Sequence, residues 1–198
     1  NEAGRIRRAL ESVAGWTSEI IVVLNDDVND GTDEIAAEFG AKVFREPWKG
    51  HIAQKNSAAQ KAGGDWLLGL DADEAVPPEL RDEIQRLFAL PEKPGRCDAY
   101  SFPRRTCYCG RWIRHGDWYP DRQTRLWRRG AAEWGGVDPH DKLLVRGGVG
   151  RLRGDLLHFS NESINHHVQK IIPFSDEFVR QQAGRQPGML ELTMRPGW

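Results

Sequence analysis

The chain has 198 residues, which is enough for one sizeable hydrophobic core or for one core with a trailing subdomain. Its 28 basic and 29 acidic residues leave a formal net charge of -1, and this near balance argues against a domain whose main task is to coat nucleic acid. No apolar run approaches the roughly 20 residues of a membrane-spanning helix, and we expect no secretory signal peptide. These features predict a folded soluble domain with no nucleic-acid partner.

The cysteines indicate the redox setting. Cys97, Cys107 and Cys109 are an odd number and lack zinc-ribbon spacing. Cys107 and Cys109 are too close together for an easy disulfide. We therefore expect reduced thiols in an intracellular protein.

The first half of the chain alternates helical and strand patterns. Ile6, Leu10 and Val13 recur at helical spacing, whereas the β-branched run over 19–24 is typical of a buried parallel strand. The predicted elements are helices over 2–14, 32–39, 51–62 and 77–87 and strands over 19–24, 41–44 and 65–70. This alternation predicts right-handed crossovers and a parallel sheet whose ligands gather at the carboxyl ends of the strands.

The composition changes after the Pro/Gly-rich stretch over 90–95. Short strands are predicted over residues 99–103, 124–127, 142–145 and 156–159. A helical pattern returns over 163–182, and Pro173 should kink or split it. The tail after residue 184 is polar and is expected to be loosely ordered.

Two strand ends of the first half carry acidic clusters, 25–30 and 71–74. Asp71 and Asp73 are two residues apart, so in an extended segment their carboxylates point the same way. Mg2+ and Mn2+ prefer such oxygen ligands and keep positions open for phosphate oxygens. The alternative is that these acids only cap the turn and the next helix.

Several motifs now form an ordered set that resembles a known family. They are Asn1-Glu2 opening a helix, Asn29-Asp30-Gly31-Thr32 after a strand, Trp48-Lys49-Gly50, Gln54-Lys55-Asn56, Gly64-Asp65-Trp66 and Asp71-Ala72-Asp73-Glu74. The set resembles family 2 glycosyltransferases with the GT-A fold, above all the bacterial branch that builds the lipopolysaccharide core. The likeness covers about the first 90 residues well and continues more loosely to about residue 172.

The resemblance implies an α/β, Rossmann-like domain with a mostly parallel sheet flanked by helices and a smaller mixed acceptor-side region. Residues 1–90 would be the half that binds the nucleotide sugar, 91–184 the acceptor-side half of the same domain, and 185–198 a tail. The implied activity is an inverting transfer from a nucleoside diphosphate sugar, with UDP favoured, to a glycan or lipid-linked acceptor. The implied cofactor is Mg2+ or Mn2+, and the implied location is the cytoplasm, including the inner face of the cytoplasmic membrane as a peripheral protein.

The resemblance also assigns donor-site residues. Asp73 matches the metal-binding acid, Asp71 would face the ribose or the metal-bound waters, and Lys55 would lie near the nucleotide. This chain has Asn25 where the family usually has a base-reading Asp after the second strand, so Asp26 or Asp27 would take that part. The family's first strand ends in a Thr-x-Asn-Glu segment, of which only Asn1-Glu2 is present here.

An inverting transfer needs one general base. By resemblance that base is Asp141, with His140 beside it as a donor or orienter; the alternative is a turn acid before a strand. His158 is predicted to be a further metal ligand or diphosphate contact, or else a core histidine.

A basic-aromatic segment follows in the second half, and within it Trp118 and Arg125 are predicted to contact the acceptor or its phosphate. The alternative for each is an exposed arginine strand with tryptophan in the core. Two other functions stay open for the whole chain: a sugar nucleotidyltransferase, and a catalytically silent domain that binds a nucleotide sugar or glycan.

Overall fold

The computed structural model describes residues 2–89, 97–137 and 140–161, together with scattered positions between 163 and 179. The chain divides into two compact units, 1–160 and 161–198, and the boundary proposed near residue 90 lies inside the first. All the site residues that follow belong to the first unit. The predicted tail, 185–198, lies outside the described residues.

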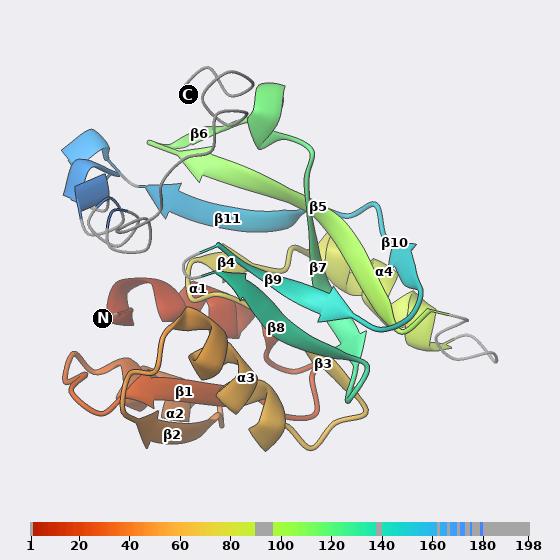
Figure 1. Cartoon of the computed structure of the whole chain (residues 1–198), viewed down its shortest axis with the longest axis horizontal. Coiled ribbons are helices and arrows are strands. Elements are labelled where there is room, and N and C mark those ends of the chain that lie inside the picture. The colour runs from red at the N-terminus through yellow and green to blue at the C-terminus, as the bar shows by residue number, and fades with distance from the viewer. Residues whose placement is uncertain are drawn as a thin grey trace, which may run out of the picture. The chain divides into compact units, whose positions relative to one another are not determined.

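The predicted elements of the first half are confirmed to within a few residues (Figure 1). They are α1 (Ala3–Val13), β1 (Ile21–Asn25), α2 (Thr32–Glu38), β2 (Lys42–Glu46), α3 (His51–Lys61), β3 (Trp66–Leu68) and α4 (Pro78–Ala89), with a short β4 (Glu74–Ala75) in addition. Thr32 is the first helical residue of α2. Asp30 supplies the cap, because its Oδ1 accepts hydrogen bonds from the Thr32 amide at 3.1 Å and hydroxyl at 2.5 Å.

The second half is built of strands. They are β5 (Ala99–Tyr108), β6 (Arg111–Trp112), β7 (Asp121–Arg128), β8 (Ala132–Val137), β9 (His140–Val145), β10 (Val149–Arg151) and β11 (Leu156–Asn161), with the 3-10 turn η1 (Gly116–Trp118) between β6 and β7. The four predicted strands correspond to β5, β7, β9 and β11. In the predicted helix over 163–182, the described positions that are helical include 164–165, 167–169 and 171–172. Pro173 lies outside the described residues.

The α/β class is confirmed, but strand direction differs from the expected mostly parallel sheet. The central order is β3-β7-β5-β11-β4, with β6 and β10 also paired to β5. The β1–β2 and β10–β5 pairs are parallel, whereas the β11–β4, β3–β7, β5–β6, β5–β7 and β8–β9 pairs are antiparallel. The chain folds back through hairpins after residue 97, so that β7 lies antiparallel to both β3 and β5. A mixed sheet results because hairpin connections can join only antiparallel strands.

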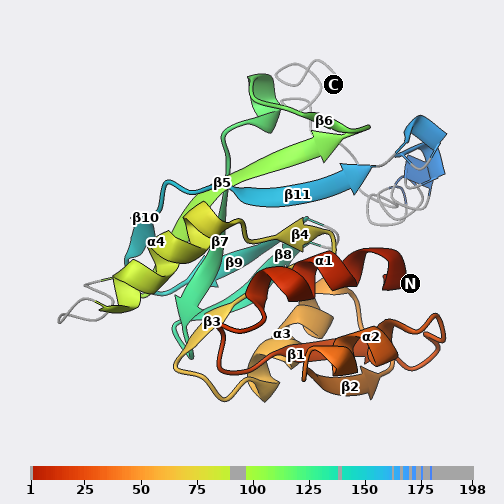
Figure 2. The same ribbon diagram turned by 180° about the vertical axis from the view of Figure 1, so that it is seen from behind.

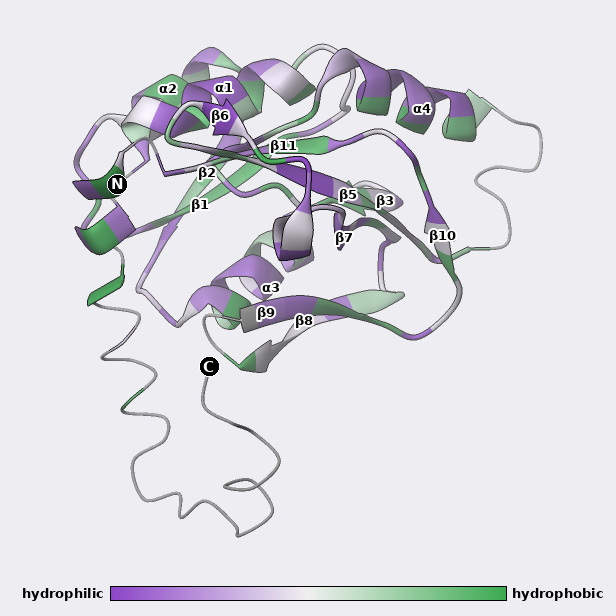
Figure 3. Cartoon of the chain, turned by 90° about the horizontal axis from the view of Figure 1, so that it is seen from above, coloured by the Kyte–Doolittle hydropathy of each residue, from purple (hydrophilic) through white to green (hydrophobic). Residues whose placement is uncertain are grey.

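Layers on the two faces of the sheet form separate cores. Figures 2 and 3 show α1, α2 and α4 on one face and α3 with the β8–β9 hairpin on the other. Val13, Leu80, Ile84, Phe102 and Leu156 belong to the core on the first face. The core on the second face is formed by Leu67, Ala99, Trp127 and Trp134. No helix among the described residues is long and apolar enough to cross a bilayer.

Candidate functional site

The end of β3 is held closely against β7. The Gly69 amide donates to the Arg125 carbonyl at 2.8 Å. A β-carbon at Gly69 would lie 3.0 Å from the Trp134 ring and 3.1 Å from the Trp127 ring, so glycine permits both indoles to pack on the backbone. This close approach fixes the start of the acidic turn that follows.

Asp71 opens that turn and is held by two cations. Its Oδ2 lies 2.7 Å from Arg125 Nη2, and its Oδ1 lies 2.8 Å from Lys55 Nζ. Arg125 also contacts Glu74 Oε1 at 3.1 Å, and Glu74 Oε2 accepts the Asp71 amide at 3.0 Å. Glu74 is 1% exposed and Arg125 is 4% exposed, so this ion-pair cluster forms the buried floor of the site.

The charges in this cluster are unequal in strength. Burial alone would raise the pKa of Asp71, but the positive charges of Arg125 and Lys55 and their hydrogen bonds hold it well below its usual range. Burial raises the pKa of Glu74 above its usual value, against the opposing charge of Arg125 and with further help from Asp71. Asp71 is therefore the stably ionised acid of the pair.

Lys55 joins this floor to the predicted base. Its Nζ lies 2.8 Å from Asp141 Oδ2 and 2.8 Å from Asp71 Oδ1. The same ammonium lies 4.6 Å from the centre of the Trp134 ring, over which Arg125 also lies at 5.1 Å. The structure thus brings Lys55, Asp71 and Asp141 together from α3, the turn after β3, and β9.

Asn56 explains why α3 and β8 hold this geometry. Its amide donates to the Trp134 carbonyl at 2.9 Å and accepts from the Trp134 amide at 2.9 Å. Both main-chain groups of Trp134 are satisfied by one side chain, so its ring stays fixed beneath the two cations. In the Gln-Lys-Asn motif, Lys55 therefore contacts the site carboxylates, while Asn56 holds α3 against Trp134 of β8.

Asp73 and His158, two of the predicted metal ligands, lie next to each other. Asp73 Oδ2 and His158 Nε2 are 3.6 Å apart, and Nδ1 of the same ring lies 3.2 Å from Thr106 Oγ1. The Phe159 amide donates to the Asp73 carbonyl at 2.8 Å, which pins the acidic turn to β11. Two ligand atoms at this spacing can share one ion, and the Thr106 contact leaves Nε2 to face it.

The residues present fit a divalent cation that is completed by substrate. Among the described residues no group of three or more His, Cys, Asp or Glu could enclose a metal. Mg2+ is commonly bound through one or two carboxylates together with phosphate oxygens, and Asp73 supplies such a carboxylate, to which the His158 imidazole would add a nitrogen ligand. Asp71 is already paired with Lys55 and Arg125, which favours Asp73 and His158 over Asp71 as the ligands.

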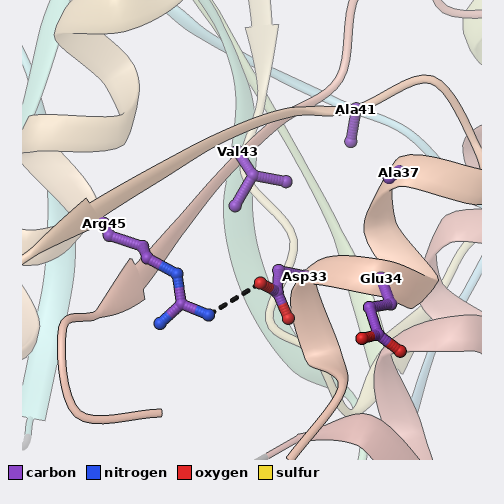
Figure 4. Close-up of a pocket in the computed structure, with 6 residues that line it drawn as sticks. All are labelled: Asp33, Glu34, Ala37, Ala41, Val43 and Arg45. Atoms are coloured by element: carbon purple, nitrogen blue, oxygen red, sulfur yellow. Dashed lines mark hydrogen bonds and ion pairs between the residues drawn. The ribbon is translucent and has the colours of Figure 1, made fainter. Parts of the chain in front are cut away.

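The other acidic segment lies at the end of the β1–β2 pair. Asn25 ends β1 opposite Glu46 of β2, and Asp27 is exposed in the turn that follows. Arg45 holds that turn through the Val28 carbonyl at 2.8 Å and reaches Asp33 of α2 at 2.7 Å. Figure 4 shows this pair lining a hollow between α2 and β2.

The predicted basic-aromatic segment is used mostly inside the protein. Arg125 is buried in the ion-pair cluster, which favours a role in holding Asp71 over contact with an acceptor. Arg122 donates to the carbonyls of Ser101 at 2.7 Å and Leu152 at 2.9 Å. Trp118 differs, because it is 44% exposed and packs edge-on against Tyr108 at 5.7 Å. The side chain of His140 lies outside the described residues.

Several site residues were missed by sequence reasoning. Glu74 and Arg104, which are 3.4 Å apart, extend the ion-pair cluster, and Arg104 also pairs with Asp121 at 2.7 Å. Trp134 and Thr106 support the cations and the histidine. Glu74 is the last residue of the acidic motif and was available as a signal; the other residues become part of the site only when β5, β7 and β8 pair.

Comparison with known proteins places the chain in a family. Residues 1–151 match the model of glycosyl transferase family 2. An uncharacterised glycosyltransferase of Rickettsia prowazekii (strain Madrid E) is 33% identical over 192 residues, covering 89% of this chain and 63% of the relative. The lipopolysaccharide core biosynthesis glycosyltransferase LpsC of Rhizobium meliloti (strain 1021) is 26% identical over 205 residues, covering 99% of this chain and 74% of the relative.

The chain spans less than two thirds of the Rickettsia prowazekii relative's length. The family match nevertheless covers the whole of the site described above, apart from His158 and the strand that carries it. The resemblance found in the motifs is thereby confirmed: the chain belongs to glycosyl transferase family 2.

Proposed function

We propose that this protein is an inverting glycosyltransferase that moves a sugar from a nucleoside diphosphate sugar to an acceptor hydroxyl. The observation that carries the proposal is the meeting of two sets of groups at one strand end. Asp73 Oδ2 and His158 Nε2 lie 3.6 Å apart, and Asp141 lies across Lys55 from Asp71. One set suits a diphosphate, and the other suits the acceptor proton.

Asp141 is proposed as the general base. Its carboxylate would take the proton of the acceptor hydroxyl while that oxygen forms the new bond to the anomeric carbon. The bond from the anomeric carbon to the diphosphate oxygen breaks, and the electron pair leaves with the diphosphate. A Mg2+ or Mn2+ ion held by Asp73 and His158 would supply Lewis-acid stabilisation of that leaving group.

The nucleotide is proposed to lie between the acidic turn and the end of β1. Ala72 of the acidic turn and Val22 of β1 both pack against the cluster of Ile6, Leu10 and Ala36, which supports a place for the turn near that strand. Asn25 and Asp27 are the proposed base and ribose contacts, and we favour UDP as the nucleotide. Asp71, which stays ionised, suits hydrogen bonds to sugar hydroxyls.

The acceptor is proposed to contact the end of the β5–β6 hairpin. Alternate residues of a strand share one face, so Tyr108 lies on the face of Thr106, whose hydroxyl contacts His158. Trp118 packs against Tyr108, and Arg111 is the cross-strand neighbour of Tyr108. Exposed aromatic faces stack on sugars and arginine binds anionic groups, which favours a phosphorylated glycan.

The biological acceptor is proposed to be a cell-envelope glycan of the lipopolysaccharide core type. Support comes from the likeness to LpsC, whose name gives that process. We place the protein in the cytoplasm, including the membrane surface where a lipid-linked acceptor would be presented.

Calorimetric titration with UDP and GDP, with and without Mn2+, tests the proposal. We expect metal-dependent binding of one nucleotide, lost in Asp73→Ala and retained in Asp65→Ala, whose carboxylate makes only a 3.8 Å surface pair with Arg129. Nucleotide binding that is unchanged both by leaving out Mn2+ and by Asp73→Ala would refute the proposed donor site. Metal-dependent binding with no transfer of sugar from the matching nucleotide sugar to any acceptor or to water would instead indicate a silent binding domain. Release of pyrophosphate from a nucleoside triphosphate and a sugar 1-phosphate would indicate a nucleotidyltransferase.

A further inference from the structure

Lys55 is shared between the two halves of the proposed reaction. One ammonium lies 2.8 Å from Asp71 on the donor side and 2.8 Å from Asp141, the proposed base. Its side chain is 23% exposed, and that of Asp141 is 13% exposed. A cation in this position sets where the base carboxylate lies.

We propose that Lys55 is a positioning residue that acts through Asp141, and not a direct contact of the nucleotide phosphates. The inference rests on the proposed function, because Asp141 is the base only if sugar transfer occurs. It replaces the expectation that Lys55 binds the nucleotide. The argument depends on what each carboxylate would lose if Lys55 were removed.

The two carboxylates depend on Lys55 unequally. Asp71 has a second cation, since Arg125 Nη2 lies 2.7 Å from its Oδ2. Among the described residues, Asp141 forms its ion pair with Lys55, and Arg125 acts on Asp141 only through its charge from farther away. Removing Lys55 therefore leaves Asp71 paired but removes the ion pair of a partly buried Asp141, whose carboxylate is then no longer held in place.

Lys55 is also fixed from below. Its ammonium lies 4.6 Å from the centre of the Trp134 ring, and Asn56 of the next helical position clamps the Trp134 main chain. To reach a phosphate, Lys55 would have to give up one or both carboxylates and this ring. Lys55 is thus held between the carboxylates of Asp71 and Asp141.

The test compares nucleotide binding with turnover in the full chain. UDP is titrated calorimetrically in the presence of Mn2+. Turnover is measured with UDP-glucose and UDP-N-acetylglucosamine as the UDP released when the sugar is transferred to water or to an acceptor. For Lys55→Met we expect UDP affinity within about threefold of wild type and kcat lowered by about 100-fold, the scale of general-base catalysis. Lys55→Arg should restore most of kcat because it keeps the charge.

The matched control is Lys49→Met. Lys49 also pairs with one carboxylate, Glu46 Oε2 at 2.6 Å, but its side chain is 43% exposed and lies outside the proposed machinery. We expect its kcat and UDP affinity to stay near those of wild type. An equal loss of kcat in this variant would show that removing any nearby ion pair slows the enzyme, and would overturn the inference.

A double variant separates action through Asp141 from action on the phosphates. If Lys55 acts only through the base, Lys55→Met with Asp141→Asn turns over no more slowly than Asp141→Asn alone. A double variant that is much slower, or a Lys55→Met that loses UDP affinity in step with kcat, identifies a phosphate contact and overturns the inference. Wild type that neither binds nor turns over any nucleotide sugar would refute the proposed function itself.

The tie can also be measured without any activity. Urea unfolding of wild type, both single variants and the double variant gives a thermodynamic cycle for the Lys55–Asp141 pair. We expect Lys55→Met to lower the unfolding midpoint less in the Asp141→Asn background than in wild type. Equal shifts in the two backgrounds would mean that the pair is not formed in solution, which would overturn the inference even for an inactive chain.

Discussion

Two acidic segments follow strands in the first half of this protein, and the sequence alone treats them alike. After β1, Asp27 is exposed in solvent and Asp30 caps α2 while its Oδ2 accepts the Ala3 amide at 3.3 Å. After β3, Glu74 is buried against Arg125, and the partly exposed Asp71 pairs with the same guanidinium. In the first segment, Asp30 uses its carboxylate to join α1 and α2 near the surface. In the second segment, the carboxylates pair with the buried guanidinium of Arg125.

The difference teaches how the protein can keep several acids in one place. Like charges brought together raise one another's pKa, so an uncompensated cluster would take up protons. Arg125 and Lys55 prevent this at Asp71, and Glu74 carries the cost through its raised pKa. A donor site that must present an ionised acid beside a diphosphate therefore needs buried cations behind it, and the segment after β1 has no such backing in the part of the chain described.

The largest expected effect is a loss of stability when an arginine is replaced by methionine beside the second acidic segment, compared with the same replacement beside the first. Arg125→Met leaves Asp71 and Glu74 without their shared cation, and breaking a buried pair costs about 3–5 kcal/mol. Arg45→Met removes the Asp33 pair, in which both side chains are about a third exposed, so water replaces the contact and the loss should be far smaller. Urea unfolding of the two variants checks this ranking. Equal losses would show that the floor of the site is not a buried ion pair in solution.

The second prediction concerns the support of His158. Thr106→Val keeps the shape of the side chain but removes the hydroxyl that contacts Nδ1 at 3.2 Å. We expect Mn2+ affinity, measured with UDP present, to fall about 10–100-fold, as is typical when a partner of a metal-ligating histidine is lost. Thr17→Val is the control, since its hydroxyl donates to the Val13 carbonyl away from the site. Unchanged affinity in Thr106→Val would exclude His158 as a ligand that Thr106 orients.

The third prediction compares the stability change caused by alanine at two glycines, Gly69 after β3 and Gly4 in α1. Gly69→Ala would push a β-carbon to 3.0 Å from Trp134 and 3.1 Å from Trp127, and such overpacking costs about 1–3 kcal/mol. Gly4→Ala in α1 meets nothing within 4 Å, so it should be neutral or slightly stabilising. Thermal unfolding of both variants measures the difference. A stable Gly69→Ala would mean that the indoles move aside easily and do not fix the acidic turn.

Most of the fold of the first half could be predicted because its signals are local. The apolar spacing of Ile6, Leu10 and Val13 defines α1, and a β-branched run defines β1. Strand direction in the second half could not be read in this way. The placement of β7 between β3 and β5 depends on long-range pairing, which a short alternating run such as 124–127 does not specify.

The candidate site was predictable only where it lies in one continuous motif. Asp71 and Asp73 follow a recognisable strand, and the family resemblance pointed to Lys55, Asp141 and His158. What these residues do to one another was not predictable, because the Lys55–Asp141 pair joins positions 86 residues apart. Trp134 carried no signal as a support for cations, since a tryptophan in a strand is ordinarily a core residue.

The smallest effect should be a pH dependence at the edge of the first region, where Glu46 ends β2. Hydrogen bonds from Lys49, Lys61 and Ser57 lower the pKa of Glu46 from 4.5 to about 2. A lowered pKa stabilises the folded state above the ordinary value of 4.5, and this stabilisation is lost as the pH falls toward 2. Glu46→Gln should therefore unfold at a lower temperature than wild type at pH 7, and the gap should close between about pH 4.5 and pH 2. Glu133→Gln, which removes only an exposed 3.7 Å pair with Arg146, should show no comparable gap. A Glu46→Gln gap that persists at pH 2 would mean that the variant disturbs packing around α3, because protonation would already have removed the charge from wild type.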